Sequence, residues 1–316
     1  MPVIASIYCP AMPSTAEPPS RVHAASLNRL LARLSRAEQA PWLHQETARR
    51  MAERLPLIRE APRDWLDWWG HQGGSANAVA QVLPKAARRV VEPTSALLEA
   101  SRRSQRRPWW SIGARPGDAQ AFHLEPEVPA GQAQLLWANM VLHASPDPSA
   151  TMARWQAALD IDGFLMFSTF GPDTLLELRE LYAEEGWAPP HAPFTDMHDI
   201  GDALVHAGFA DPVMDQEHLV LTWSSPQALL AELRSMGAQL DGSRPPGLRT
   251  PRWRDRLLAA LARRVDAEGR IRMSFELVYG HAVKVKPRAR RGEPVTISVE
   301  EVRSSLRKPR AGPDRS

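Results

Sequence analysis

Glycines and carboxylates in the first half of the chain stand in the order that a nucleotide-like ligand requires. Asp67 lies within a short apolar run, and Gly70 and Gly73 follow that run. Glycines at such a turn let the backbone come close to a ligand. Glu92 comes about twenty residues later, where a carboxylate can accept hydrogen bonds from two ribose hydroxyls. The alternatives are an ordinary tight turn and a helix-capping or solvated glutamate.

Histidines and cysteine form no pattern that favours a metal. Cys9 is the only cysteine, which excludes an intramolecular disulfide framework and a cysteine-based zinc site. His191 and His198 have no cysteine partner, and Asp196 and Asp199 beside them suit turn and helix N-cap positions. We therefore predict no metal, and a reduced, cytoplasmic setting.

The elements that must position these residues alternate between strands and helices. Apolar runs predict strands at 65–69, 89–91, 135–138 and 164–167. Helical patterns fall at 75–83, 95–103, 150–159, 174–185 and 199–207. This alternation is typical of βαβ units on a parallel sheet. A further strand is expected just before Asp118, where an Arg-rich stretch with Trp109 and Trp110 stands.

The C-terminal end breaks this alternation. Runs at 213–223 and 274–285 have strand character, and helical stretches at 226–240 and 253–267 lie between them. We therefore predict a helical insertion, at about 226–268, before the last strand. The predicted fold is α/β, with a seven-stranded, mainly parallel sheet, helices on both faces and one antiparallel strand.

Composition divides the chain into four predicted segments: a disordered start at 1–23, helices at 24–59, the main domain at 60–285 and a basic disordered tail at 286–316. The net charge is +3, but ten Lys/Arg against four Asp/Glu from Lys284 onward give +6 there, so the rest carries −3. The basic excess is a solvated end, and we expect no nucleic-acid partner. No apolar run approaches the roughly 20 residues of a membrane span, and no secretory signal is present.

The turn after the first strand resembles the D-x-G-x-G-x-G turn of S-adenosylmethionine-dependent enzymes. Asp67 and Gly73 keep the pattern, whereas Trp69 and His71 stand where that family has glycine. The resemblance implies S-adenosylmethionine as cofactor. The ligands it implies are Asp67, Gly70, Gly73, Glu92, Asp118, Ala119 and Asn139. In that family an acid after the third strand meets the adenine amino group, which points to Asp118; a turn aspartate is the alternative.

A narrower resemblance begins at the fourth strand. The segment 135–143 matches the strand-Asn-x-x-Leu-His motif of methyltransferases. The segment 167–179, FSTFGPDTLLELR, is similar to the malonyl-acyl-carrier-protein O-methyltransferases of biotin synthesis, and 194–215 and 275–282 continue the likeness. It implies a Rossmann-like class I methyltransferase and an acyl carrier protein as partner. The departures lie in the first half, where 41–46 replaces a Tyr-containing helix that lies over the cofactor.

The reaction that this family catalyses selects the catalytic candidates. The free carboxylate of a malonyl thioester is already a nucleophile at neutral pH, so alignment matters more than a base. An arginine fork suits that anion, and Arg179 is the candidate, with a surface arginine paired to Glu180 or Glu184 as the alternative. His143 either lines the same crevice or caps a turn.

Two other functions remain open at this point. The altered glycine turn also suits a degenerate methyltransferase-like protein that acts as a binding or assembly partner. A methyltransferase for another acid, or for a protein side chain, is the second. Arginines at 254, 256, 263 and 264 offer a basic rim for an acidic carrier protein. The sequence does not indicate an oligomeric state.

Overall fold

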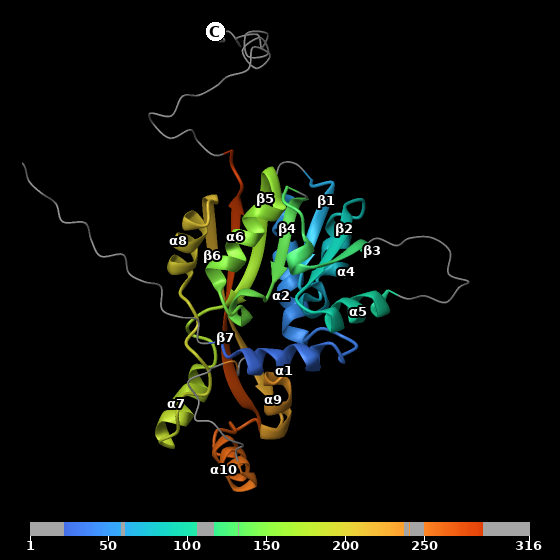
Figure 1. Cartoon of the computed structure of the whole chain (residues 1–316). Helices are drawn as coiled ribbons and strands as arrows, with labels where there is room; N and C mark the ends of the chain where they lie inside the picture. The colour runs from blue at the N-terminus through green and yellow to red at the C-terminus, as the bar shows by residue number, and fades with distance from the viewer. Residues whose placement is uncertain are drawn as a thin grey trace, which may run out of the picture.

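The computed structural model describes residues 22–57, 61–105, 117–131, 133–236, 240 and 250–286. Within them, seven strands form one sheet in the order β3-β2-β1-β4-β5-β7-β6 (Figure 1). The strands are β1 (Asp64–Trp68), β2 (Ala87–Glu92), β3 (Ala119–Leu124), β4 (Ala133–Asn139), β5 (Leu159–Phe170), β6 (Ala210–Trp223) and β7 (Ile271–Val283). Only β7 runs antiparallel to its neighbours β5 and β6. The predicted sheet is confirmed.

Helices connect the strands and close the site. The α-helices are α1 (Ala24–Leu34), α2 (Trp42–Ala52), α3 (Gly70–Gly73), α4 (Ala76–Val82), α5 (Ser95–Ser104), α6 (Pro148–Ala158), α7 (Leu176–Glu184), α8 (Met197–His206), α9 (Pro226–Leu233) and α10 (Pro251–Ala262). Short 3-10 turns are η1 (Leu55–Leu57), η2 (Glu125–Glu127) and η3 (Leu142–Ala144). Asp196 caps α8 by accepting the His198 N–H, as its sequence position predicts. Both helices of the predicted insertion, α9 and α10, are present before β7.

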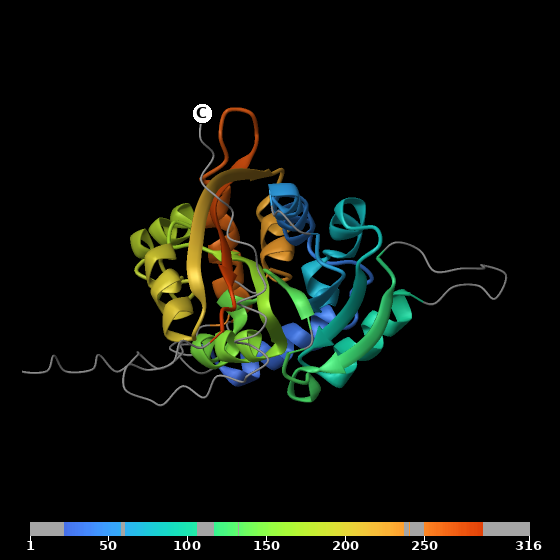
Figure 2. The same cartoon turned by 90° about the horizontal axis from the view of Figure 1, so that it is seen from above.

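The sheet separates two hydrophobic cores, and helices lie on both of its sides in Figure 2. Side chains alternate along β4, so that Leu135 and Trp137 face one core while Leu136 and Ala138 face the other. The first core includes side chains of α2, α4, α7, α9 and α10, and the second includes those of α1, α5, α6 and α8. Because both faces are covered, the inner strands read as nearly continuous apolar runs in the sequence.

The carboxyl ends of the parallel strands lie together along the lower edge of the sheet in Figure 1, where α1, α9 and α10 gather. The strand order reverses between β1 and β4, and ligands of open α/β sheets bind at such a point beyond the carboxyl ends of the strands. This edge is therefore the place to look for a site. No helix of the described residues is long and apolar enough to cross a bilayer.

Two expectations need comment. The third strand follows Asp118 instead of preceding it, because β3 begins at Ala119; Trp109 and Trp110 lie outside the described residues. The predicted disordered start and basic tail also lie outside them, except for 22–23 at one end and residue 286 at the other.

Candidate active site

The glycine turn follows β1 with two large side chains in it. Trp69 has a φ of 56°, in the left-handed region, where a residue with a Cβ costs about 1–2 kcal/mol more than glycine. Its N–H donates to the Val91 carbonyl (2.7 Å), and its side chain is buried. The backbone therefore keeps a conformation that suits glycine, while a buried indole occupies the adjoining space.

His71 links this turn to the N-terminal helices. Its backbone N–H donates to Glu92 Oε1 (2.8 Å), and its ring Nε2 lies 3.2 Å from the carbonyl oxygens of Leu34 and Ala37. A carbonyl can only accept, so Nε2 carries the hydrogen. The imidazole therefore holds the carboxyl end of α1 against the turn.

Glu92 ends β2 with one carboxylate oxygen satisfied and one unsatisfied. Oε1 accepts from the His71 N–H and from the Ser101 hydroxyl (2.6 Å). Oε2 is buried and has no donor within the described residues. Burial raises the pKa of this carboxyl to about 8. An unfilled acceptor at the carboxyl end of β2 fits the ribose hydroxyls of a nucleoside cofactor.

Asp67 lies beside the turn, with one carboxylate oxygen paired and the other, Oδ1, buried without a partner in the described residues. Its Oδ2 accepts from Arg88 Nε (2.8 Å) and Nη2 (2.5 Å), and both side chains are buried. Burial is the larger influence on the Asp67 pKa and raises it, while Arg88 lowers it. A Cβ on Gly70 would lie 2.7 Å from Asp67 Oδ2, so Gly70 is needed to let the turn pass over this ion pair.

Asp118 lies at the wrong end of its strand to join this group. It precedes β3, whereas Glu92 and Asn139 stand at the carboxyl ends of β2 and β4. Since these strands are parallel, Asp118 and Ala119 lie at the opposite edge of the sheet, and the Ala119 N–H donates to Gln105 Oε1 (2.9 Å). The expectation that Asp118 follows the third strand is wrong.

The acid that follows β3 is Glu125, which sequence reasoning missed. Its Oε1 accepts from the indole N–H groups of Trp68 (3.0 Å) and Trp69. The available signal was a Glu-Pro pair at 125–126, the same pair that ends β2 at 92–93. The carboxylate that follows β3, where a nucleoside cofactor would place its base, is therefore already engaged by two indoles.

Asn139 joins three elements at the end of β4. Its Nδ2 donates to the carbonyls of Gly73 (2.6 Å) and His44 (2.7 Å), and its Oδ1 accepts from the Ser168 hydroxyl (2.6 Å). The amide thus fixes the glycine turn, α2 and β5 relative to one another. Gly73 packs directly on this side chain, because a Cβ there would lie 3.6 Å from that of Asn139.

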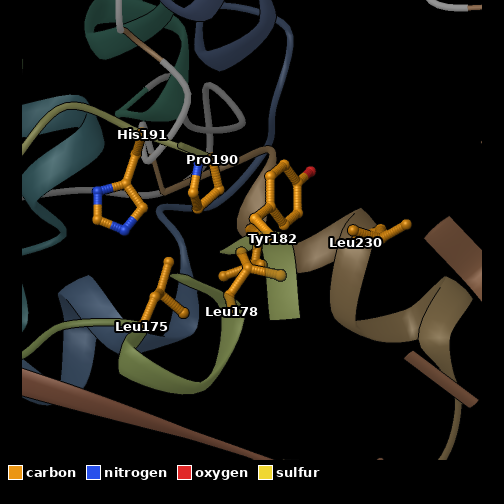
Figure 3. Close-up of a pocket in the computed structure, with 7 residues that line it drawn as sticks. Leu175, Leu178, Tyr182, Pro190, His191 and Leu230 are labelled. Carbon is orange, nitrogen blue, oxygen red and sulfur yellow. The ribbon is translucent and has the colours of Figure 1, made fainter. Parts of the chain in front are cut away.

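A line of rings leads from this turn to a pocket. His44 on α2 and His143 on η3 have centroids 6.3 Å apart, His143 and Phe194 are also 6.3 Å apart, and Phe194 stacks on His191 at 4.8 Å. His191 borders a small cavity between α7 and α9. The lining is mainly apolar: Leu175, Leu178, Tyr182, Pro190, His191, Leu230 and Leu233. Figure 3 shows Pro190 between the rings of His191 and Tyr182.

Arg179 lies one turn into α7, the helix whose Leu178 and Tyr182 line this cavity. Its Nη2 donates to the Pro172 carbonyl (2.8 Å), and its Nε is buried without a partner within the described residues. Glu184 pairs with Arg264 instead, so the alternative of an Arg179–Glu184 surface pair is not found. Arg179 therefore keeps a buried donor available beside the loop that follows β5.

That loop is held by Glu276 of β7, another residue that the sequence analysis did not single out. Glu276 Oε2 accepts the Asp173 N–H (2.7 Å), and the Glu276 carbonyl accepts the Gly171 N–H (2.9 Å). A Cβ on Gly171 would come within 2.4 Å of the Glu276 carboxyl carbon. Asp173, His218 and Glu276 also offer ligand atoms within 4.8 Å of one another, but two of the three are exposed; the absence of a metal stays a prediction.

Comparisons with known proteins show the family. A model described as a methyltransferase domain matches residues 40–211. The malonyl-[acyl-carrier protein] O-methyltransferase of Laribacter hongkongensis is 38% identical over 80% of this chain and 86% of its own length. Those of Halorhodospira halophila (36%; 78% and 83%) and Gallionella capsiferriformans (35%; 79% and 86%) are similar. A solved putative methyltransferase from Bacillus halodurans, 12% identical, covers 75% of this chain and 99% of its own, with a TM-score of 0.47.

The sheet with its antiparallel β7, together with the matched domain, defines a class I methyltransferase, an enzyme whose methyl donor is S-adenosylmethionine. Within that class, the chain belongs to the malonyl-acyl-carrier-protein O-methyltransferase family.

Proposed function

We propose that this enzyme methylates the free carboxylate of a malonyl thioester carried by acyl carrier protein, in biotin synthesis. The observation that carries the proposal is the likeness to relatives of that name along most of the chain. It includes the loop at 171–174, which is bonded to β7 beside Arg179. The cytoplasmic setting and the division into segments stay predictions.

The cofactor half of the proposal rests on the edge formed by β1, β2 and β4. S-adenosylmethionine, when bound, supplies a methyl group activated by a positively charged sulfur. Glu92 Oε2 would accept from the ribose hydroxyls, and the backbone at Gly70 and Gly73 would allow close approach. Asn139 would hold that turn in place, and Asp67 would support it from beside. Asp118 and Ala119 leave the set of ligands, because they lie at the start of β3 and not at its carboxyl end.

The acceptor half rests on Arg179 and the rings beside it. A carboxylate that leaves water without a partner pays a large desolvation penalty, which a guanidinium offsets. Arg179 Nε–H is such a donor, and its place on α7, which borders the cavity between α7 and α9, suits an acceptor that arrives on a flexible, largely uncharged arm. No strong base is required, and the enzyme's task is to align the carboxylate with the methyl carbon.

Docking of the carrier is proposed on α10. Arg263 and Arg256 pair with Glu185, and Arg264 pairs with Glu184, so three of the four candidate arginines are already engaged by α7. Each pair has one side chain that is more than half-exposed, and such surface pairs hold their partners weakly. An acidic carrier could therefore exchange with Glu184 and Glu185 at this surface.

The experiment is methyl transfer from S-adenosylmethionine to malonyl-acyl carrier protein, followed by mass spectrometry of the carrier. Acetyl-acyl carrier protein is the matched control, because it has the same arm and no free carboxylate. We expect one added methyl group on the malonyl carrier alone. The gene should also restore growth of a biotin-requiring strain that lacks this step. Failure of both assays would overturn the substrate assignment and favour another acid or a protein side chain.

A further inference from the structure

Two imidazoles, that of His44 buried and that of His143 half-buried, meet at the carboxyl ends of β4 and β5. His44 comes from α2 and His143 from η3, and their rings lie edge to face, with an interplanar angle of 77°. Neither residue is used by the cofactor contacts described above. Their position between the glycine turn and Phe170, the last residue of β5, places them where the two reactants must meet.

The hydrogen bonds of the two rings fix where their hydrogens are. His44 Nδ1 lies 2.9 Å from the Gln72 carbonyl oxygen, and His143 Nε2 lies 3.2 Å from the Met236 carbonyl oxygen. Carbonyl oxygens only accept, so both of these nitrogens carry hydrogen. The other nitrogens, His44 Nε2 and His143 Nδ1, are then bare lone pairs, and both are buried without a donor in the described part of the chain.

The surroundings of the pair are apolar and uncharged. Phe170 lies 4.6 Å from His143 and Phe194 lies 6.3 Å from it, while Gln72 and Met236 contribute only carbonyls. The influences on the pKa values of the two rings are burial, the backbone carbonyls and, for His143, the neighbouring His44. Burial lowers the pKa of His44 to about 4; burial and the nearby His44 lower that of His143 to about 3. Both rings are therefore neutral at pH 7 in the absence of substrate.

We propose that this pair is a second binding point for the acceptor. When a malonyl-type carboxylate enters, one imidazole takes up a proton and, as imidazolium, donates a hydrogen bond to the oxygen that does not attack. The inference rests on the proposed function, because it assumes an anionic acceptor at this edge. It gives the second carboxylate oxygen a partner that Arg179 alone does not provide.

The charges of this step balance. One proton enters from water with the carboxylate, the free oxygen attacks the methyl carbon, and the electron pair of the broken carbon–sulfur bond leaves with the sulfur. The product ester is neutral, so the imidazolium loses its counter-charge and returns the proton to water. A carboxylate about 4 Å away, at the effective dielectric of proteins, raises a neighbouring imidazole pKa by about 3. His44, which starts from about 4, would then titrate near neutrality.

The test is calorimetric titration of the protein, saturated with S-adenosylhomocysteine, with malonyl-acyl carrier protein at about pH 6. Repeating it in buffers of different ionisation enthalpy gives the number of protons taken up. We expect about one proton per carrier bound, and an affinity that falls up to about tenfold per pH unit between about pH 5 and 7 and levels off above neutrality. His44→Phe and His143→Phe should each reduce this uptake. His198→Phe, at an exposed histidine on α8, should leave it unchanged.

The possible outcomes separate the two proposals. Binding of the malonyl carrier without proton uptake would overturn this inference and leave the proposed function standing. No binding of the malonyl carrier at all would count against the proposed function. Undiminished uptake in both histidine variants, or equal uptake with acetyl-acyl carrier protein, would show that the proton goes elsewhere. Circular dichroism of each variant establishes that it is folded.

Discussion

At the carboxyl ends of β1 to β3, large side chains stand where the family has glycine, whereas the loop after β5 keeps the family motif. In the first region Trp69 holds a left-handed backbone, and His71 reaches across to α1. The indole N–H groups of Trp68 and Trp69 both donate to Glu125 Oε1. The backbone path is preserved there, but different contacts preserve it.

In the loop after β5, several residues of the motif contact the same residue, Glu276. Thr174 Oγ1 lies 3.1 Å from both the backbone N and the carbonyl oxygen of Glu276. The Glu276 side chain accepts the Asp173 N–H, and Gly171 has no room for a Cβ beside that carboxylate. A change at one of these positions breaks contacts at the others. The motif after β5 is therefore kept because its residues share hydrogen bonds with Glu276. The glycine turn after β1 can change because a new side chain fills the space beside an unchanged backbone.

The first test of this contrast is Arg88→Ala, which should have the largest effect. Removing Arg88 leaves Asp67 buried and unpaired beside the glycine turn. Breaking a buried ion pair on one side costs about 3–5 kcal/mol of folding free energy. Urea unfolding should show that loss. The double variant Asp67→Leu with Arg88→Met should recover most of it, because it removes both charges. Equal instability of the single and double variants would contradict an electrostatic origin.

Arg179→Ala tests the acceptor region. Removing a buried, hydrogen-bonded charge partner costs about 2–5 kcal/mol, so turnover on the malonyl thioester should fall roughly 30-fold or more. Affinity for S-adenosylhomocysteine should stay nearly unchanged, since Arg179 lies on α7, away from β1 and β2. Arg102→Ala, at an exposed ion pair with Glu99 on α5, is the matched control and should keep nearly full turnover. Unchanged turnover in Arg179→Ala would remove this residue from the site.

Glu92→Gln tests the cofactor region. At neutral pH this carboxyl, with a pKa of about 8, is mostly uncharged, and a hydrogen bond between neutral groups contributes about 0.5–1.5 kcal/mol, so affinity for S-adenosylhomocysteine should fall by up to about tenfold. Glu92→Ala should weaken it further. Calorimetry measures both, with Glu99→Gln on the exposed face of α5 as the control. No heat from the native protein at millimolar ligand would show that the indoles beside Glu125 close the site.

The same variant also changes how stability depends on pH. The folded pKa of Glu92, about 8, lies above its ordinary value, so the folded state binds more protons between roughly pH 4.5 and 8. Stability should therefore fall as pH rises through that window, by up to about 1.4 kcal/mol per pH unit. Glu92→Gln should flatten this slope in thermal unfolding. A slope that persists in the variant would assign it to another group.

The sequence predicted the sheet well because periodicity is strong in buried strands. β4 and β5 are almost wholly buried, so their apolar runs mark them plainly. β3 was misplaced because it is an edge strand: none of its residues is fully buried, and its sequence lacks an apolar run. That error carried Asp118 into the site and left Glu125 out. One misplaced strand therefore moved a candidate ligand to the opposite edge of the sheet.

Contacts between residues far apart along the chain could not be predicted from the sequence, for a different reason. Asp67 resembles a ligand by position, but its partner Arg88 lies in the neighbouring strand, and register alone brings them together. The contact between Glu276 and the loop at 171–174 spans about a hundred residues and depends on the antiparallel placement of β7. Spacing along the chain carries no record of such pairs.

His71→Gly should have the smallest effect and sharpens the contrast from the other side, because it restores the glycine of the family turn. The variant loses the hydrogen bonds from the ring to the Leu34 and Ala37 carbonyls, which should cost about 1 kcal/mol. Its backbone N–H to Glu92 is retained, so cofactor affinity should not decrease. Hydrogen exchange should report faster exchange in α1 while the sheet stays protected. His198→Ala, at an exposed histidine on α8, should leave α1 unchanged. If α1 keeps its protection from hydrogen exchange in His71→Gly, packing of its buried leucines holds it in place, and the imidazole only occupies space beside the turn.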